Sequence, residues 1–83
     1  MVITVEISMY PFREEFRSLI KDFIRKLNEI DGLKIASGST STVIIGDYDL
    51  VMDTLKEMFR WSLETHGKAV FVTKFLPGYQ PSE

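Results

Sequence analysis

The chain contains no cysteine and only 3 prolines among its 83 residues. Without cysteine there can be no disulfide, no thiolate nucleophile and no thiolate-ligated metal site. A single domain of this size buries only a little over ~60% of the surface that its unfolded chain exposes, so its stability is marginal. Because no covalent crosslink can add stability, we expect a partner subunit to do so.

Clustered charge and long hydrophobic runs are also missing. Lys and Arg number 10 against 12 Asp and Glu, and the net charge is −2. The basic residues form no block, which disfavours nucleic acid as a partner. The longest uncharged stretch, 35–46, is rich in serine and threonine, and a membrane span needs ~20 apolar residues. Residues 1–6 alternate like a strand and lack the pattern of a signal peptide, so we expect a cytoplasmic protein without membrane insertion.

Residues for catalysis or metal binding are equally scarce. The only histidine, His66, precedes Gly67 and lies far from any group of acids in the sequence. A histidine at the end of a helix is typically exposed or favours the helix dipole. The spacing of Asp47, Asp49 and Asp53 is typical of the start of a helix and lacks the features of a calcium loop. No nucleophile motif or phosphate-binding glycine loop is present, so we expect neither an enzyme nor a bound cofactor or metal.

Hydrophobic periodicity predicts a strand over 2–10, a helix over 12–30, strands over 33–37 and 40–45, a helix over 47–66 and a strand over 69–76. The order βαββαβ is that of the ferredoxin-like fold, an α+β sandwich in which two helices cover one face of a four-stranded antiparallel sheet. Prolines 77 and 81 cannot donate to a sheet. We therefore predict a domain over 1–76 and a loop-like tail over 77–83.

Alternation within the strands predicts which side chains face the helices. We expect Ile3, Val5, Ile7, Met9, Val43 and Ile45 to lie in the core, together with Ser41 on the helix side and the phenylalanines of the first helix. The open face then receives Glu6, Ser8, Tyr10, Thr40, Thr42 and Ile44. For the last strand the pattern leaves two choices open, since Phe71, Thr73 and Phe75 compete with Val70 and Val72 for the core.

Three segments carry a resemblance to a known family. They are Ser8-Met9-Tyr10-Pro11, the stretch from Gly38 to Gly46 with its Ser41-Thr42 pair, and the Gly46-Asp47 start of the second helix. Together they resemble the YkoF-like family, which implies non-enzymatic binding of thiamine or its hydroxymethylpyrimidine moiety in salvage or uptake. The chain departs from the family pattern at Thr40, where methionine is frequent, and it has one repeat instead of two. A site between repeats would therefore require a homodimer or homotetramer.

An aminopyrimidine ring offers both donors and acceptors, and serine, threonine and tyrosine hydroxyls match both. The first and third strands are neighbours in this fold, so their polar residues come together. The predicted ligand contacts are Glu6, Ser8, Tyr10, Ser39, Thr40, Ser41 and Thr42.

Simpler interpretations of the same residues stay open. Glu6 could meet only water or a lysine such as Lys34 or Lys74. The hydroxyls could serve only turns and strands, since threonine favours strands and serine favours turns. A second hypothesis is an interaction module that pairs through its open sheet, with Ile44, Phe71 and Phe75 as the contact surface. RNA binding is a third hypothesis, weakened by the negative net charge.

Overall fold

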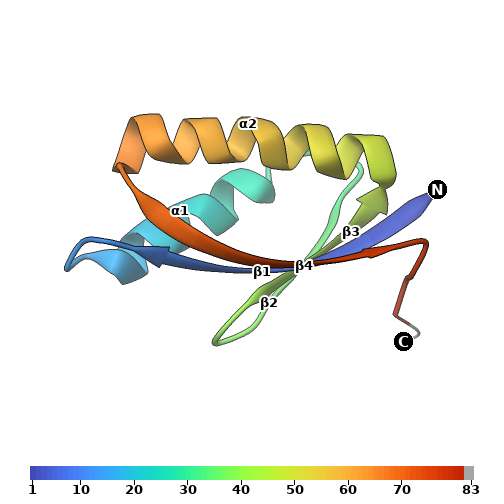
Figure 1. Ribbon diagram of the computed structural model, residues 1–83, viewed down its shortest axis with the longest axis horizontal. Coiled ribbons are helices and arrows are strands. Elements are labelled where there is room, and N and C mark those ends of the chain that lie inside the picture. The colour runs from blue at the N-terminus through green and yellow to red at the C-terminus, as the bar shows by residue number, and fades with distance from the viewer. Residues whose placement is uncertain (82–83) are drawn as a thin grey trace.

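The computed structural model describes residues 1–81 as one antiparallel sheet with two helices on the same face (Figure 1). The elements in chain order are β1 (Val2–Pro11), α1 (Phe16–Leu27), β2 (Lys34–Ser37), β3 (Thr42–Asp47), α2 (Tyr48–His66) and β4 (Ala69–Pro77). The strand order is β2-β3-β1-β4. The predicted α+β ferredoxin-like sandwich is confirmed, and the hairpin of β2 and β3 lies beside β1 as expected.

The core lies between β1 and the helices. Alternate residues of β1 (Ile3, Val5, Ile7 and Met9) are buried, as their period of two predicts. Leu19, Phe23 and Leu27 recur every four residues along α1 and are buried, and Phe23 and Leu27 belong to the core cluster of the β1 residues. From α2 come Val51, Leu55 and Met58. One face of the sheet therefore holds the core, and the other is left without helices.

The predicted orientation of the β3 side chains is wrong. Thr42 and Ile44 face the helices, where Val43 and Ile45 were expected. Val5 pairs with Ile44 and Ile7 with Thr42, and partners in an antiparallel ladder share a face. Ile44 is 1% exposed and Thr42 is 5% exposed on the helix side, whereas Val43 and Ile45 are only half-buried. The amide of Gly38 donates to the Ser41 carbonyl at 2.8 Å, and this turn sets the register.

Helix α1 is shorter than predicted. It begins at Phe16, because residues 12–15 turn before the first helical hydrogen bonds, from the amides of Ser18 and Leu19 to the Glu15 carbonyl. Phe12 is 67% exposed and Phe16 is 44% exposed. The expectation that all phenylalanines of this helix are core is therefore wrong, and only Phe23 meets it.

Helix α2 has the predicted ends. The side chain of Asp47 accepts hydrogen bonds from the amides of Asp49, at 3.2 Å, and Leu50, at 3.3 Å. This is the capping arrangement that the sequence indicates. At the other end Gly67 has a φ of 81°, and its amide donates to the Leu63 carbonyl at 3.0 Å. Glycine suits this left-handed conformation, which ends the helix.

Strand β4 resolves the choice that its pattern left open. Phe71 pairs with Met9 on the helix side. The centroid of its ring lies 5.2 Å from the ring centroid of Phe23 and 4.8 Å from that of Phe59. Thr73 and Phe75 share this face, because they pair with Ile7 and Val5. Val70 and Val72 lie on the open face and are exposed.

The end of the chain runs beside the start of β1. β4 includes Pro77, one residue beyond the expected limit, and Gly78 donates its amide to the Val2 carbonyl at 2.7 Å. The Thr4 hydroxyl donates to the Tyr79 carbonyl at 2.6 Å, and Thr4 is buried. Residues 82–83 of the predicted tail lie outside the described residues, and the boundary after residue 76 stays a prediction. No helix within residues 1–81 is long and apolar enough to span a membrane.

Candidate functional site

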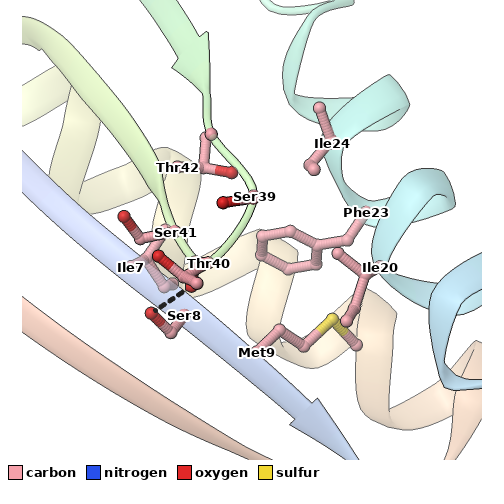
Figure 2. Close-up of a pocket in the computed structure, with 11 residues that line it drawn as sticks. Ile7, Ser8, Met9, Ile20, Phe23, Ile24, Ser39, Thr40, Ser41 and Thr42 are labelled. Atoms are coloured by element: carbon pink, nitrogen blue, oxygen red, sulfur yellow. Dashed lines mark hydrogen bonds between the residues drawn. The ribbon is translucent and has the colours of Figure 1, made fainter.

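Two hollows meet at the tip of the β2–β3 hairpin. The first, here called the helix-side hollow, lies between this tip, β1 and α1 (Figure 2). It is lined by Ile7, Ser8, Met9, Ile20, Phe23, Ile24, Gly38, Ser39, Thr40, Ser41 and Thr42. The second, the open-face hollow, is lined by Glu6, Ser8, Tyr10, Thr40, Ser41, Val72 and Lys74. Three hydroxyl residues, Ser8, Thr40 and Ser41, line both.

All seven residues predicted from the sequence line at least one of the hollows, although they do not form one cluster. Ser39 and Thr42 belong to the helix-side hollow, and Glu6 and Tyr10 to the open-face hollow. The prediction for Ser41 and Thr42 is reversed, because the hydroxyl of Ser41 reaches Glu6 on the open face while Thr42 lies on the helix side. Their role as ligand contacts stays a prediction.

The helix-side hollow combines apolar walls with hydroxyls that have no partner. Figure 2 shows Ile20, Phe23 and Ile24 of α1 facing the hairpin tip, with Ser39 and Thr42 across the gap. Within residues 1–81 the side-chain hydroxyls of Ser39, Thr40 and Thr42 make no hydrogen bond. Hydroxyls both donate and accept, so this wall can bind a polar ligand edge while the α1 wall contacts an apolar face.

The size of this hollow limits its ligand. Its cavity volume is about 70 Å³. That space suits one substituted ring. The open-face hollow is wider, with about 240 Å³ by the same measure, and is more exposed to solvent.

The side chains of Glu6, Ser8, Ser41 and Lys74 in the open-face hollow already have polar partners. Lys74 Nζ lies 3.3 Å from Glu6 Oε1, and the Ser41 hydroxyl donates to Glu6 Oε2 at 3.2 Å. Glu6 thus meets a lysine, as its simpler interpretation holds, and the lysine is Lys74. The Ser8 hydroxyl donates to the Thr40 carbonyl at 2.9 Å, and Tyr10 is 54% exposed at the end of its strand.

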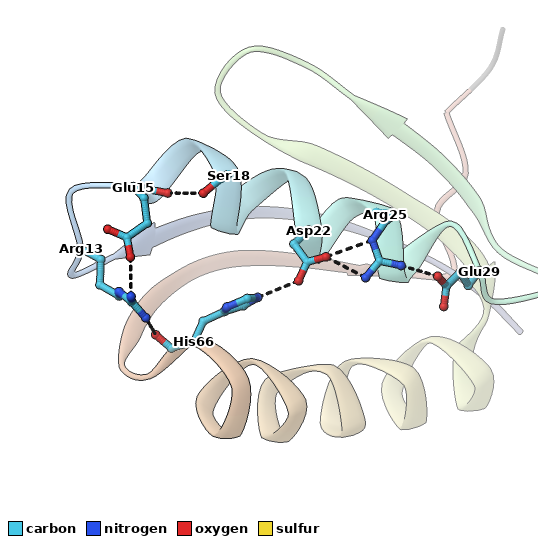
Figure 3. A network of polar contacts seen from close by, with 7 residues as sticks. All are labelled: Arg13, Glu15, Ser18, Asp22, Arg25, Glu29 and His66. Atoms are coloured by element: carbon cyan, nitrogen blue, oxygen red, sulfur yellow. Dashed lines mark hydrogen bonds and ion pairs between the residues drawn. The ribbon is translucent and has the colours of Figure 1, made fainter.

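A polar network that the sequence analysis missed joins the two helices (Figure 3). His66 Nε2 lies 2.8 Å from Asp22 Oδ2, and Asp22 Oδ1 accepts from the Arg25 guanidinium at 2.7 and 3.0 Å. The His66 side chain is only 13% exposed. Of the two alternatives expected for His66, exposure to solvent is therefore wrong, whereas its place at the end of the helix holds, because it lies in the last turn of α2. The pair links the end of α2 to α1, which supplies one wall of the helix-side hollow.

This network predicts a change in stability at low pH. Hydrogen bonds from Arg25 and then from His66 hold the pKa of Asp22 below its ordinary value of 3.8. A carboxyl whose pKa is lowered by folding stabilises the protein above its unfolded pKa, and this stability is lost as the pH falls through the folded pKa. Asp22→Asn should therefore lower the Tm at pH 7 and reduce the further loss of Tm below pH 3.8. Thermal unfolding followed by circular dichroism from pH 7 to pH ~2 measures both.

Asp53→Asn is the matched control, because Asp53 is exposed on α2. It removes the same charge without touching the network, so its pH profile should follow that of the unmodified protein. An Asp22→Asn profile that also follows it at every pH contradicts the stabilising role of the network.

The chain is similar to known proteins along nearly its whole length. No curated protein matches it. A Thermotoga maritima protein provisionally assigned to thiamine biosynthesis or salvage shares 26% identity and a TM-score of 0.79, over 90% of this chain and 82% of the other. A Streptococcus pneumoniae protein shares the fold at 18% identity and a TM-score of 0.84, over 95% and 89% of the two chains. A Methanocaldococcus jannascii protein shares the fold at 22% identity and a TM-score of 0.78, over 98% of this chain and 84% of the other.

The chain also matches a family model. The YKOF-related family matches residues 2–77, which include every strand and helix of the fold and both hollows. This match confirms the resemblance that the motifs at residues 8–11, 38–46 and 46–47 indicate. The chain belongs to the YKOF-related family.

Proposed function

We propose that this protein binds the hydroxymethylpyrimidine moiety of thiamine, free or as part of thiamine, in the helix-side hollow, and that it does so without catalysis. A thiamine-related role is suggested by the family and by the Thermotoga maritima protein provisionally assigned to thiamine biosynthesis or salvage. We further propose that the binding serves thiamine salvage or uptake.

The observation that carries the proposal is the pairing of an apolar α1 wall with unpartnered hydroxyls on the hairpin. An aminopyrimidine is flat, so its face can lie against the Phe23 ring. Its exocyclic amine donates and its ring nitrogens accept, and the hydroxyls of Ser39 and Thr42 can meet both needs. A ring bound in this way replaces water on polar groups that have no other partner within residues 1–81.

Charge and size favour the pyrimidine half over the whole of thiamine. The hollow has room for one substituted ring. The thiazolium of thiamine is a cation, and the nearest carboxylate of the adjoining open-face hollow, Glu6, is already paired with Lys74. We therefore expect free hydroxymethylpyrimidine to bind at least as tightly as thiamine.

Self-association is part of the proposal. Tyr10, Val70, Val72 and Leu76 are exposed and lie on the open face or at its edge. Apolar side chains gathered on one face favour pairing with a second copy, as a homodimer or homotetramer. The interaction surface expected from the sequence needs correction, because Ile44 is buried and Phe71 and Phe75 face the helix side.

A thermal-shift experiment tests ligand binding. Hydroxymethylpyrimidine at a concentration of 100 times its Kd should stabilise the folded state by roughly 2.7 kcal/mol and raise the Tm by roughly 10–20 °C. Thiamine, its phosphates and cytosine serve as comparisons, since cytosine is an aminopyrimidine without the hydroxymethyl group.

An unchanged Tm with hydroxymethylpyrimidine and with thiamine at millimolar concentration contradicts the proposed function. If light scattering then shows a dimer, and Val72→Glu on the open face converts it to a monomer, the second candidate function is favoured. That candidate is an interaction module that uses the exposed residues Val70, Val72 and Leu76.

A further inference from the structure

A third hollow lies at the far end of α2, away from the hairpin. It is lined by residues from the loop after β1, the last turns of α2 and the start of β4, and they include Phe12, Phe59, Ser62, Leu63, Lys68 and Phe71. The cavity volume of this hollow, here called the α2-end hollow, is about 360 Å³. It shares no lining residue with the helix-side hollow.

Three phenylalanines, Phe12, Phe59 and Phe71, line this hollow. Phe59 and Phe71 are in contact, with ring centroids 4.8 Å apart, and both pack against the core. Phe12 is 67% exposed and Leu63 is 58% exposed at the rim. The Phe12 amide donates to the Lys68 carbonyl at 3.4 Å, which holds the loop against the start of β4. Large apolar side chains left exposed around a hollow are typical of a binding surface.

The second observation is a buried hydroxyl without a partner. Ser62 lines the hollow and is 1% exposed, and its Oγ makes no hydrogen bond within the described residues. A polar group buried in this way destabilises the folded state unless some partner satisfies it. Such groups are rare in native proteins, and a bound molecule is one way in which they are satisfied. A ligand with a hydrogen-bonding atom would supply the missing partner by displacing the side chains that cover Ser62.

The positive charge of Lys68 indicates that the ligand also carries an anionic group. Lys68 is the only ionisable residue among the residues that line the hollow, and its side chain makes no ion pair within residues 1–81. An ammonium at the rim of an apolar hollow attracts an anionic group. The rings, the hydroxyl and the lysine are together complementary to a flat aromatic acid.

We propose that the α2-end hollow is a second small-molecule site, which binds a small aromatic carboxylate with its ring among Phe12, Phe59 and Phe71, its charge near Lys68 and a polar atom at Ser62. This site does not depend on the proposed pyrimidine function, since the two hollows have no residue in common.

Phenylacetate tests the proposal in an NMR titration of the ¹⁵N-labelled protein. We expect saturable shifts of the amides of Ser62, Lys68 and Phe71, and weaker binding of benzyl alcohol, which has the ring without the charge. Ser62→Ala should weaken phenylacetate binding by up to about tenfold while raising the Tm, because it removes the unpartnered hydroxyl. Lys68→Gln should weaken phenylacetate binding several-fold and leave benzyl alcohol binding unchanged.

Two controls match these variants. Thr65→Ala changes an exposed hydroxyl residue on the same helix, and Lys56→Gln removes a charge elsewhere on α2. Neither should alter phenylacetate binding. The proposal is overturned if phenylacetate causes no saturable shift, if Ser62→Ala binds it as tightly as the unmodified protein, or if benzyl alcohol binds as tightly as phenylacetate. Shifts at these amides that follow protein concentration instead of phenylacetate also overturn it, since they indicate contact with a second copy.

Discussion

Replacing Phe23 by alanine is expected to remove most of the stability of the fold. Phe23 is 3% exposed, and its ring contacts that of Phe71 across the core. Truncating a buried phenylalanine costs about 3–5 kcal/mol, against about 4–12 kcal/mol in total for a domain of this length. Urea unfolding followed by circular dichroism should therefore show a midpoint far below that of the unmodified protein, or no folded baseline.

Phe16→Ala is the matched control for this result. It is the same truncation on the same helix, but Phe16 is 44% exposed, so the cost should stay below about 1 kcal/mol. Phe23→Leu should retain most of the stability while removing the flat ring from the helix-side hollow. Equal losses for Phe16→Ala and Phe23→Ala would contradict the placement of α1 on the sheet.

The second large effect is expected at Thr42 and concerns ligand affinity. Thr42→Val keeps the shape of the side chain and removes a hydroxyl that has no hydrogen bond within residues 1–81. The fold should lose little stability, because no hydrogen bond between protein groups is broken. The bound pyrimidine would lose the hydrogen bond from one of its polar atoms to the Thr42 hydroxyl. Leaving that ligand atom buried without a partner costs about 1–3 kcal/mol and weakens binding by about 10- to 100-fold. Isothermal titration calorimetry with hydroxymethylpyrimidine measures the change.

The control for Thr42 is Thr54→Val, since Thr54 is also a buried threonine but lies on α2 away from the helix-side hollow. It should leave the affinity unchanged. Tyr10→Phe tests the open-face hollow and should also have little effect. The assignment of the site to the helix-side hollow fails if Tyr10→Phe weakens binding more than Thr42→Val does.

The element order could be predicted because its signals are local. Strict alternation along β1 and the Asp47 cap and Gly67 end of α2 each depend on neighbouring residues alone. The faces of β3 could not be predicted, because Val43, Ile44 and Ile45 are all β-branched and show no period. Their register depends on where the hairpin turns, and a slip of one residue exchanges the faces. For this reason the sequence predicts the wrong face of the sheet for both Ser41 and Thr42.

Contacts between distant segments left no signal in the sequence. Asp22 and His66 are 44 positions apart, and nothing near either residue indicates the other. Phe12 continues the helical spacing but lies in the turn before α1, and Phe16 lies in the first turn of α1, so both side chains are exposed although their spacing predicts core positions. Likewise, the run of hydroxyls over residues 39–42 is visible in the sequence, while its division between two hollows depends on the fold.

We propose that a pyrimidine ring binds between the hairpin tip and α1. An NMR titration of the ¹⁵N-labelled protein with hydroxymethylpyrimidine can locate the ring, because each amide reports its own position. We predict saturable shifts at Met9, at Phe23 and across residues 39–42. Shifts confined to Glu6, Tyr10, Val72 and Lys74, or no shift at any residue, would contradict the claim.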